Sequence, residues 1–403
     1  MSKTRFGCAL LASLLAAASP RSARAYDVDP NLSVDLYFQE WFTVYEQMED
    51  LRGLYQHPSN DEAADGTSGF RLANARVGLR TRTTDHRFGL VALVRLEKDT
   101  GILDLYGTAA VAPWLTLLAG QFPVPSTYEN LQPNPELDFL LRTQIAGALS
   151  DYALSRTTHA SSLFYGNRSY RRDMGVGFRM HGEPGGLPIR TFGMVSNGFG
   201  ANLHVGGETN REYVIANKPF DWFYAGRLEV EPWPGVVTLG GHASYNRHND
   251  IVFNSGRAVL DIRRTSYSTD LRFDYAPSGV RGAVAYGAGK NLDDWDDDGA
   301  VDFAYEGWEW RLVGRLNPLL KELTGWPALD HHAFELAFRY DALTTESDES
   351  GVRIRHRTWT PGFNYLYEDF LKVQANWIVR RTDDPFNPDL ADNAFILSLQ
   401  GRI

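Results

Sequence analysis

Residues 371–380 read Leu-Lys-Val-Gln-Ala-Asn-Trp-Ile-Val-Arg, a stretch in which apolar and polar side chains alternate. Successive side chains of a β-strand point to opposite faces, so this stretch predicts a strand with one apolar and one polar face. The closing residues 393–403 and residues 69–82 repeat the pattern. One face suits hydrocarbon and the other suits water, which is typical of a transmembrane β-barrel. We therefore predict an all-β fold, a transmembrane antiparallel β-barrel of about 16 strands.

The same period-two pattern recurs along the whole chain, and Gly, Pro, Asn and Asp bound each segment. It predicts sixteen strands, an even number that leaves both chain ends on the periplasmic side. The segments are 31–45, 69–82, 86–97, 103–111, 114–122, 173–181, 188–196, 219–230, 236–246, 262–275, 279–289, 302–315, 331–342, 353–366, 370–381 and 393–403.

The predicted connections alternate between long and short, as outer-membrane barrels alternate external loops with periplasmic turns. If 46–68 is external, tight turns such as 83–85 and 276–278 fall on the opposite side. Two connections depart from the pattern, because 98–102 is short for an external loop and 316–330 is long for a turn. The longest connection, 123–172, follows the fifth strand. Folded into the lumen, it would form a constriction.

A soluble β-sandwich is the main alternative, because its strands also alternate. No linker or change in composition divides the chain into units of sandwich size, however. The charge-free stretch 105–128 is interrupted by Pro113, Gly120, Pro123 and Pro125, which argues against a helix that spans the membrane. Tryptophans near strand ends would form interfacial belts. They are Trp41, Trp114, Trp222, Trp308, Trp310, Trp359 and Trp377.

Residues 1–25 have the features of a signal peptide: basic residues at the start, an apolar run, and the small-residue ending Ala23-Arg24-Ala25. We expect cleavage near Ala25 and localisation to the outer membrane of a Gram-negative cell, with residues 26–403 as the barrel.

Removal of the signal peptide leaves 36 basic and 50 acidic residues, a net charge of −14. Such an acidic chain argues against a nucleic-acid partner. The single cysteine, Cys8, is removed with the signal, so the mature chain has no thiol for a disulfide or a metal site.

Three parts of the chain resemble the phosphate-selective porin O and P family. They are Phe70 to Leu79 (FRLANARVGL), Pro113 to Pro125 with its Gly120-Gln121-Phe122 motif, and the C-terminal segments Phe334 to Tyr340 and Asn393 to Leu397. The resemblance implies a sixteen-stranded homotrimeric porin with an inward-folded third external loop and basic residues in the channel. Position 123 is Pro where family members commonly carry Lys between the Phe and the Val, so the anion contact that this Lys implies is missing here.

Alternation places a set of basic residues on the lumen side or in the predicted constriction loop. Rings of Arg or Lys favour anions, so we predict a porin for small hydrophilic solutes with a modest preference for anions, surrounded by outer-membrane lipid. The same charges could instead pair with lumen acids and only solvate the wall. The candidates for pore lining and anion contact are Arg76, Arg80, Arg82, Arg95, Arg142, Arg156, Arg168, Arg171, Arg172, Arg339, Lys372 and Arg380.

One predicted external loop has the Asp-x-Asp-x-Asp-Gly opening of a calcium loop, with Asp294, Asp296, Asp298 and, farther on, Asp302. Position 12 is Tyr305 rather than a bidentate Glu, so a solvated acidic loop competes with a Ca²⁺ site. We expect no other cofactor.

The chain has none of the common local hydrolase motifs, and we predict that it is not an enzyme. A barrel hydrolase with residues from distant strands and a barrel whose loops serve adhesion are the alternative functions.

Overall fold

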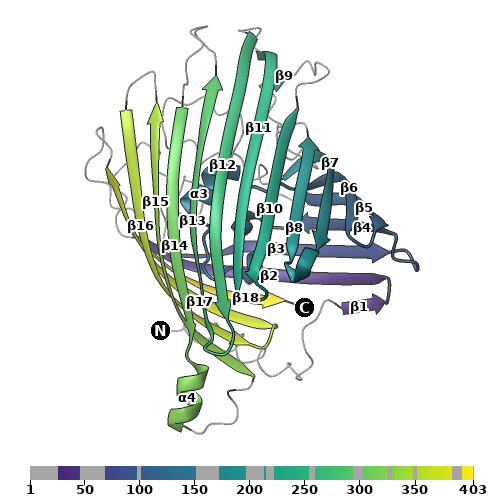
Figure 1. Cartoon of the computed structure of the whole chain (residues 1–403). Helices are drawn as coiled ribbons and strands as arrows, with labels where there is room; N and C mark the ends of the chain where they lie inside the picture. Colours follow the sequence, from purple (N-terminus) through teal and green to yellow (C-terminus); the bar gives the residue numbers. More distant parts are fainter. Residues whose placement is uncertain are drawn as a thin grey trace.

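Sixteen of the strands in the described part of the chain form one closed antiparallel ring (Figure 1). The computed structural model describes residues 26–45, 69–97, 101–150, 172–196, 213–214, 222–253, 259–293, 303–324, 329, 331–347, 352–383 and 393–402. Each strand pairs with its neighbours in chain order, and β18 closes the ring by pairing with β2. This confirms the predicted fold class.

The ring consists of β2 (Leu32–Tyr45), β3 (Gly69–Arg82), β4 (Phe88–Arg95), β5 (Gly101–Ala112), β6 (Leu115–Pro123), β7 (Arg172–Gly182), β8 (Ile189–Ser196), β10 (Phe223–Trp233), β11 (Val237–Phe253), β12 (Val259–Tyr275), β13 (Val280–Asp293), β14 (Phe303–Arg315), β15 (His332–Ser347), β16 (Val352–Tyr367), β17 (Leu371–Asp383) and β18 (Ala394–Arg402). Two short strands add to it: β1 (Tyr26–Asp29) pairs with β2, and β9 (Tyr213–Val214) pairs with β11. All sixteen predicted segments coincide with strands of the ring.

The apolar face of each strand lies on the outside of the barrel. Trp377 of β17 pairs with Phe395 of β18, and the two side chains are 60% and 40% exposed. Their neighbours Ile378 and Ile396 point inward and are fully buried. An exposed tryptophan and phenylalanine side by side are expected on a surface that contacts lipid.

A bulge in β3 keeps the apolar residues outside over its whole length. Gln39 pairs with Asn74 and Glu40 pairs with Leu72, so Ala73 is an extra residue in β3. Strict alternation from Asn74 would turn Phe70 and Leu72 into the lumen. The extra residue inverts the alternation, and Phe70 is 75% exposed on the outer face.

Short turns join the strands at one end of the barrel, at residues 83–87, 113–114, 234–236, 276–279 and 368–370. The predicted long turn 316–330 lies at this end too, and it contains helix α4 (Asn317–Thr324), which points away from the barrel (Figure 1). Asn317 anchors this turn, since its amide donates to the Leu329 carbonyl (3.0 Å) and accepts from the Phe334 N–H (2.9 Å). A short 3-10 turn, η3 (Pro184–Gly186), joins β7 to β8.

At the opposite end, several strands are longer than the sequence predicted, including β13, which ends at Asp293, and β15, which ends at Ser347. β11 continues to Phe253 and β12 starts at Val259, so the expected loop 247–261 shrinks to residues 254–258. A register shift between His248 and Ile251 lets the ladder continue. The sequence of this region lacks the alternation of apolar and polar residues, and a strand without that alternation resembles a loop in sequence. No helix in the described ranges is long and apolar enough to span a membrane.

The outward position of Leu397, near the middle of β18, leads to a stability prediction. Leu397→Arg places a charge in hydrocarbon and should lower the free energy of unfolding by about 2–4 kcal/mol. Ala276→Arg, in an exposed turn, is the matched control and should change it by less than about 0.5 kcal/mol. Urea titration in lipid vesicles, followed by tryptophan fluorescence, measures both. Equal effects at the two positions would show that Leu397 does not face hydrocarbon.

Candidate functional site

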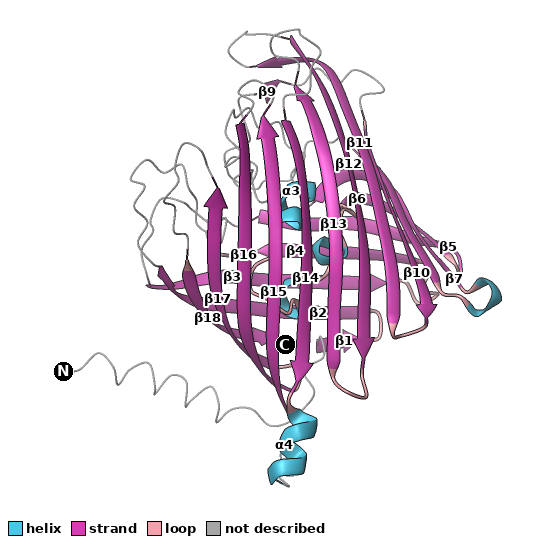
Figure 2. Cartoon of the chain, turned by 60° about the vertical axis from the view of Figure 1, so that its left-hand side comes forward, coloured by secondary structure: helices cyan, strands magenta, loops and turns pink. Residues whose placement is uncertain are grey.

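The segment that follows β6 enters the barrel lumen (Figure 2). It comprises residues 124–150, here called the constriction segment, and contains α2 (Tyr128–Leu131), the 3-10 turn η1 (Asn134–Glu136) and α3 (Gln144–Ser150). The Thr127 hydroxyl caps α2 by accepting from the Asn130 N–H (3.1 Å). The described part of the predicted loop 123–172 is therefore folded inward, as the sequence predicted.

Apolar side chains of the segment are buried against the inner wall. Phe139 packs on Val313 and Ala337, and Leu140 packs in a cluster with Trp41 and Ile396. The wall residues in these clusters are inward-facing apolar side chains that pack against the segment. Burying a Phe or Leu side chain contributes about 1.5–3 kcal/mol, so these contacts favour the folded-in position.

Helix α3 lies close to the wall because two glycines face it. A Cβ at Gly287 would be 2.6 Å from Leu149 Cδ1, and a Cβ at Gly307 would be 3.2 Å from Ile145 Cβ. Ile145 and Leu149 also pack against Leu343 and Tyr305. Because these wall residues are small, one face of α3 packs closely against β13 and β14.

Glu129 is the electrostatic centre of the segment. Its carboxylate accepts from the Thr143 N–H and hydroxyl, both at 2.8 Å, and lies 3.3 Å from Arg311 and 4.0 Å from Arg339. Its side chain and both guanidinium groups are at most 4% exposed. Burial raises the pKa of Glu129, but the charges of Arg311, Arg339 and Arg142 lower it by more, so the pKa lies below that of an ordinary glutamate. The ionised form therefore links the segment to β14 and β15.

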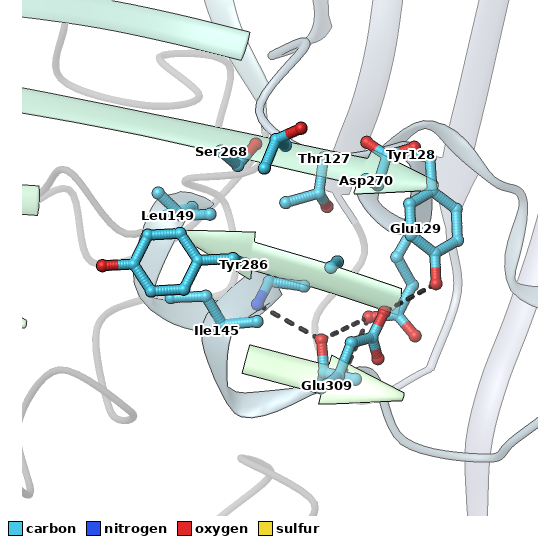
Figure 3. A pocket seen from close by; sticks show the side chains of 13 residues that line it. Thr127, Tyr128, Glu129, Ile145, Leu149, Ser268, Asp270, Tyr286 and Glu309 are labelled. Atoms are coloured by element: carbon cyan, nitrogen blue, oxygen red, sulfur yellow. Dashed lines mark hydrogen bonds between the residues drawn. The ribbon is translucent and has the colours of Figure 1, made fainter. Parts of the chain in front are cut away.

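Tyr128 makes a second contact at the same place. Its hydroxyl donates to Glu309 (2.6 Å), and Arg311 lies over its ring at 4.6 Å. Burial raises the pKa of Tyr128 well above its ordinary value, so it stays a donor. A pocket enclosing about 250 Å³ of empty space, its mouth included, lies beside this contact (Figure 3). Residues of the segment and of β12–β14 line it, among them Thr127, Ser268 and Asp270.

A third set of contacts holds the middle of the segment. Asp138 binds Arg281 at 2.6 Å, and Arg281 also binds Glu335 at 2.9 Å. Burial raises the pKa of Asp138, but Arg311 and Arg281 lower it by more, so its pKa is below the ordinary value. The Leu137 carbonyl accepts from Lys372, and the Leu140 N–H donates to Asn376 at 2.8 Å.

The predicted pore residues divide by what they contact. Arg339, Lys372 and Arg142 hold the segment, because each donates to one of its carbonyl oxygens: Leu141, Leu137 and Gln132. Arg172 pairs with Asp104 at 2.6 Å, and Arg76 lies 3.7 Å from Glu97. Arg80 is 57% exposed and lies 3.8 Å from Asp35.

Three further predicted residues lie toward the ends of their strands. Arg82 is exposed at the end of β3, Arg95 is half-buried at the end of β4, and Arg380 donates to Thr358 at 3.4 Å. Several predictions lie outside the described residues: Arg156, Arg168 and Arg171 of the loop, the acidic set Asp294, Asp296, Asp298 and Asp302, and the signal peptide.

Arg281 was missed by the sequence analysis although it binds both Asp138 and Glu335. Its inward-facing companions on β13 are Ala283, Ala285, Gly287 and Gly289, which differ little in polarity from the outward set. A strand with small residues on both faces gives no clear assignment of faces. The available sequence signal for Arg281 was its positive charge within a predicted strand.

The depressed pKa values of Glu129 and Asp138 predict how acid affects the segment. A carboxylate with a lower pKa in the folded state stabilises that state fully above the ordinary carboxyl pKa of about 4, and the effect is lost as the pH falls through the lowered value. Single-channel current should therefore be steady from pH 7 to about pH 4 and become noisy below it. Glu129→Gln should be noisy already at pH 7. Glu136→Gln, at a half-exposed carboxylate, is the control, and a quiet Glu129→Gln channel would contradict the role of Glu129.

Comparisons with known proteins agree with this architecture. Residues 258–400 match the family model "Phosphate-selective porin O and P". No curated protein sequence matches the chain.

Similar solved structures include an anion-selective porin from Comamonas acidovorans (TM-score 0.58, 8% identity, covering 92% of this chain and 99% of that one). They also include the outer membrane channel DcaP of Acinetobacter baumannii (0.55, 10%, 95% and 100%) and OmpF of Salmonella typhi (0.54, 8%, 93% and 98%). At these identities the similarity concerns the fold. The chain thus has the fold of outer-membrane porins, and its C-terminal part, β12 to β18, matches the phosphate-selective porin O and P family.

Proposed function

We propose that the protein is a passive outer-membrane pore for small hydrophilic solutes, narrowed by the constriction segment and modestly selective for anions. The observation that carries the proposal is the segment itself, which is fixed inside a closed barrel by buried charges and apolar contacts. Its bonds reach from Asn74 of β3 to Ser268 of β12. The family match also favours a channel over a barrel hydrolase or an adhesion scaffold.

The preference for anions is supported by exposed arginines beside buried carboxylates in the lumen near the short-turn end. Asp35 lies between Arg80 (3.8 Å) and Arg402 (3.7 Å). Glu335 lies between Arg281 (2.9 Å) and Arg315 (3.7 Å). Arg402 also lies 3.7 Å from Glu136, and Arg281 also binds Asp138, so the charges of each cluster balance. The carboxylates of Asp35 and Glu335 are only 15% and 1% exposed, however, so the solvent meets mainly the arginines.

Two of these arginines are placed to interact with a solute. The side chains of Arg80 and Arg315 are 57% and 47% exposed, so they contact the lumen water while sharing a carboxylate. The buried charges act differently, because Arg311, Arg339 and Glu129 compensate one another under the segment. The preference should accordingly be modest rather than strict.

Reversal potentials in a KCl gradient test this selectivity. The wild-type channel should pass chloride more readily than potassium, and Arg80→Gln/Arg315→Gln should reduce the ratio because it removes two exposed lumen charges. Arg87→Gln, in the exposed turn between β3 and β4, is the control and should leave the ratio unchanged. A clear potassium preference of the wild-type channel would refute the proposed anion selectivity.

We also propose that the chain is exported with cleavage after Ala25 and that three mature copies associate. Export is supported by the signal-like residues 1–25, and trimerisation by the family resemblance. Intact mass should correspond to a chain that begins at Tyr26, and cross-linking in membranes should give a band of three copies. A mass that includes residues 1–25, or cross-linked products that end at two copies, would contradict the respective proposal.

A further inference from the structure

Strands β16 and β17 are neighbours in the barrel wall (Figure 1). Four arginines of these strands face outward near the barrel end that carries the long connections. Arg353, Arg355 and Arg357 occupy alternate positions of β16, and Arg381 is the cross-strand partner of Arg357. The intervening residues Ile354 and His356, and Thr358 after Arg357, are buried on the inner side. We call these four residues the outer basic patch.

Aromatic residues place the patch relative to the bilayer. Trp359 lies two residues from Arg357 toward the short-turn end, and Trp377 lies four residues from Arg381 in the same direction. Both face outward, and Tyr340 packs beside Trp359 with ring centroids 5.3 Å apart. Outward Trp and Tyr mark the level of the lipid headgroups. The patch therefore lies at the outer surface of the membrane.

The patch is unfavourable for the barrel alone. Like charges directly opposite each other on neighbouring strands are destabilising, and Arg357 and Arg381 form such a pair. Arg357 bonds to Asp383, and Arg353 lies 3.3 Å from Glu306. Within the described part of the chain, Arg355 forms no ion pair.

The pattern recurs on β11 and β12, where Arg247 and Arg263 form a second like-charge cross-strand pair, both exposed. Basic residues outnumber acidic ones on the outward face of β11–β17 beyond the aromatic level. Among the described side chains there, seven are basic and three are acidic: Arg247, Arg263, Lys290, Arg353, Arg355, Arg357 and Arg381, against Glu306, Glu346 and Asp383. This excess contrasts with the acidic composition of the whole chain.

We infer that the outer basic patch binds the phosphorylated headgroup of an outer-leaflet lipid. The planar guanidinium group matches phosphate in a bidentate geometry, and a phosphate between Arg357 and Arg381 would relieve their repulsion. Arginines two residues apart on a strand are about 7 Å apart, so neighbouring phosphates can be bound along β16. A lipid is the occupant that the position favours, because the patch faces away from the lumen at headgroup height. This role is separate from the pore.

Binding of lipid A to the purified barrel in zwitterionic micelles, measured by native mass spectrometry, tests the inference. The wild-type protein should bind phosphorylated lipid A and should bind the same lipid poorly after phosphatase treatment. Arg355→Gln/Arg381→Gln should weaken binding of the phosphorylated lipid about tenfold or more, since each basic residue near an anionic surface contributes about a factor of five. Arg87→Gln/Lys321→Gln removes the same charge from the opposite end and should bind like wild type.

Chloride conductance should be unchanged in the Arg355/Arg381 double variant, which shows that the barrel is folded. Wild-type affinity of that variant, or equal binding of the dephosphorylated lipid, would overturn the inference. Displacement of the lipid by millimolar inorganic phosphate would assign the patch to free phosphate instead. Cross-linking of a second copy through the patch in lipid-free micelles would assign it to a protein interface.

Discussion

The pairing of β18 with β2 is the contact on which the rest of the molecule depends. In hydrocarbon, no water is available to bond an unpaired N–H or C=O, so a sheet can span a membrane only if it has no open edge. Nine residue pairs from Ala394–Tyr45 to Arg402–Tyr37 close the ring. Closure separates an outer surface that contacts lipid from an inner surface that contacts water. The alternation of side chains then follows along every strand.

Inside the ring, the constriction segment is held by charges that would be costly to bury singly. Glu129 loses water on folding, and it regains two hydrogen bonds from Thr143 and two arginines from the wall. Removing one partner of such a group leaves the others unpaired, which typically costs about 3–5 kcal/mol. The apolar contacts of Phe139 and Leu140 have no such directional requirement. The charges therefore determine where the segment lies, and the apolar contacts contribute to how strongly it stays there.

The sequence predicted all sixteen strands of the ring because water and lipid impose the period-two pattern on the strands within the bilayer. It failed where that pattern is absent: the extensions of β11 and β12 lack the alternation, and α4 lies beyond the short-turn end. For the site, alternation placed Arg339 and Lys372 in the lumen but could not show that both bind the segment. Those partners come from residues about 200 or more positions away along the chain, and a single sequence does not contain that pairing.

The basic residues of this barrel therefore serve three purposes that composition does not distinguish. Buried ones such as Arg311 compensate acids of the segment, and half-exposed ones such as Arg80 contact the lumen water. Outward ones such as Arg355 face the headgroup level of the membrane. A net charge of −10 for the whole chain does not report on any of these sites. Because the wall is one strand thick and inner and outer positions alternate along it, Arg355 and the inward-facing His356 are adjacent in sequence yet lie in different surroundings. The face of the strand, more than the identity of the residue, determines what each arginine can bind.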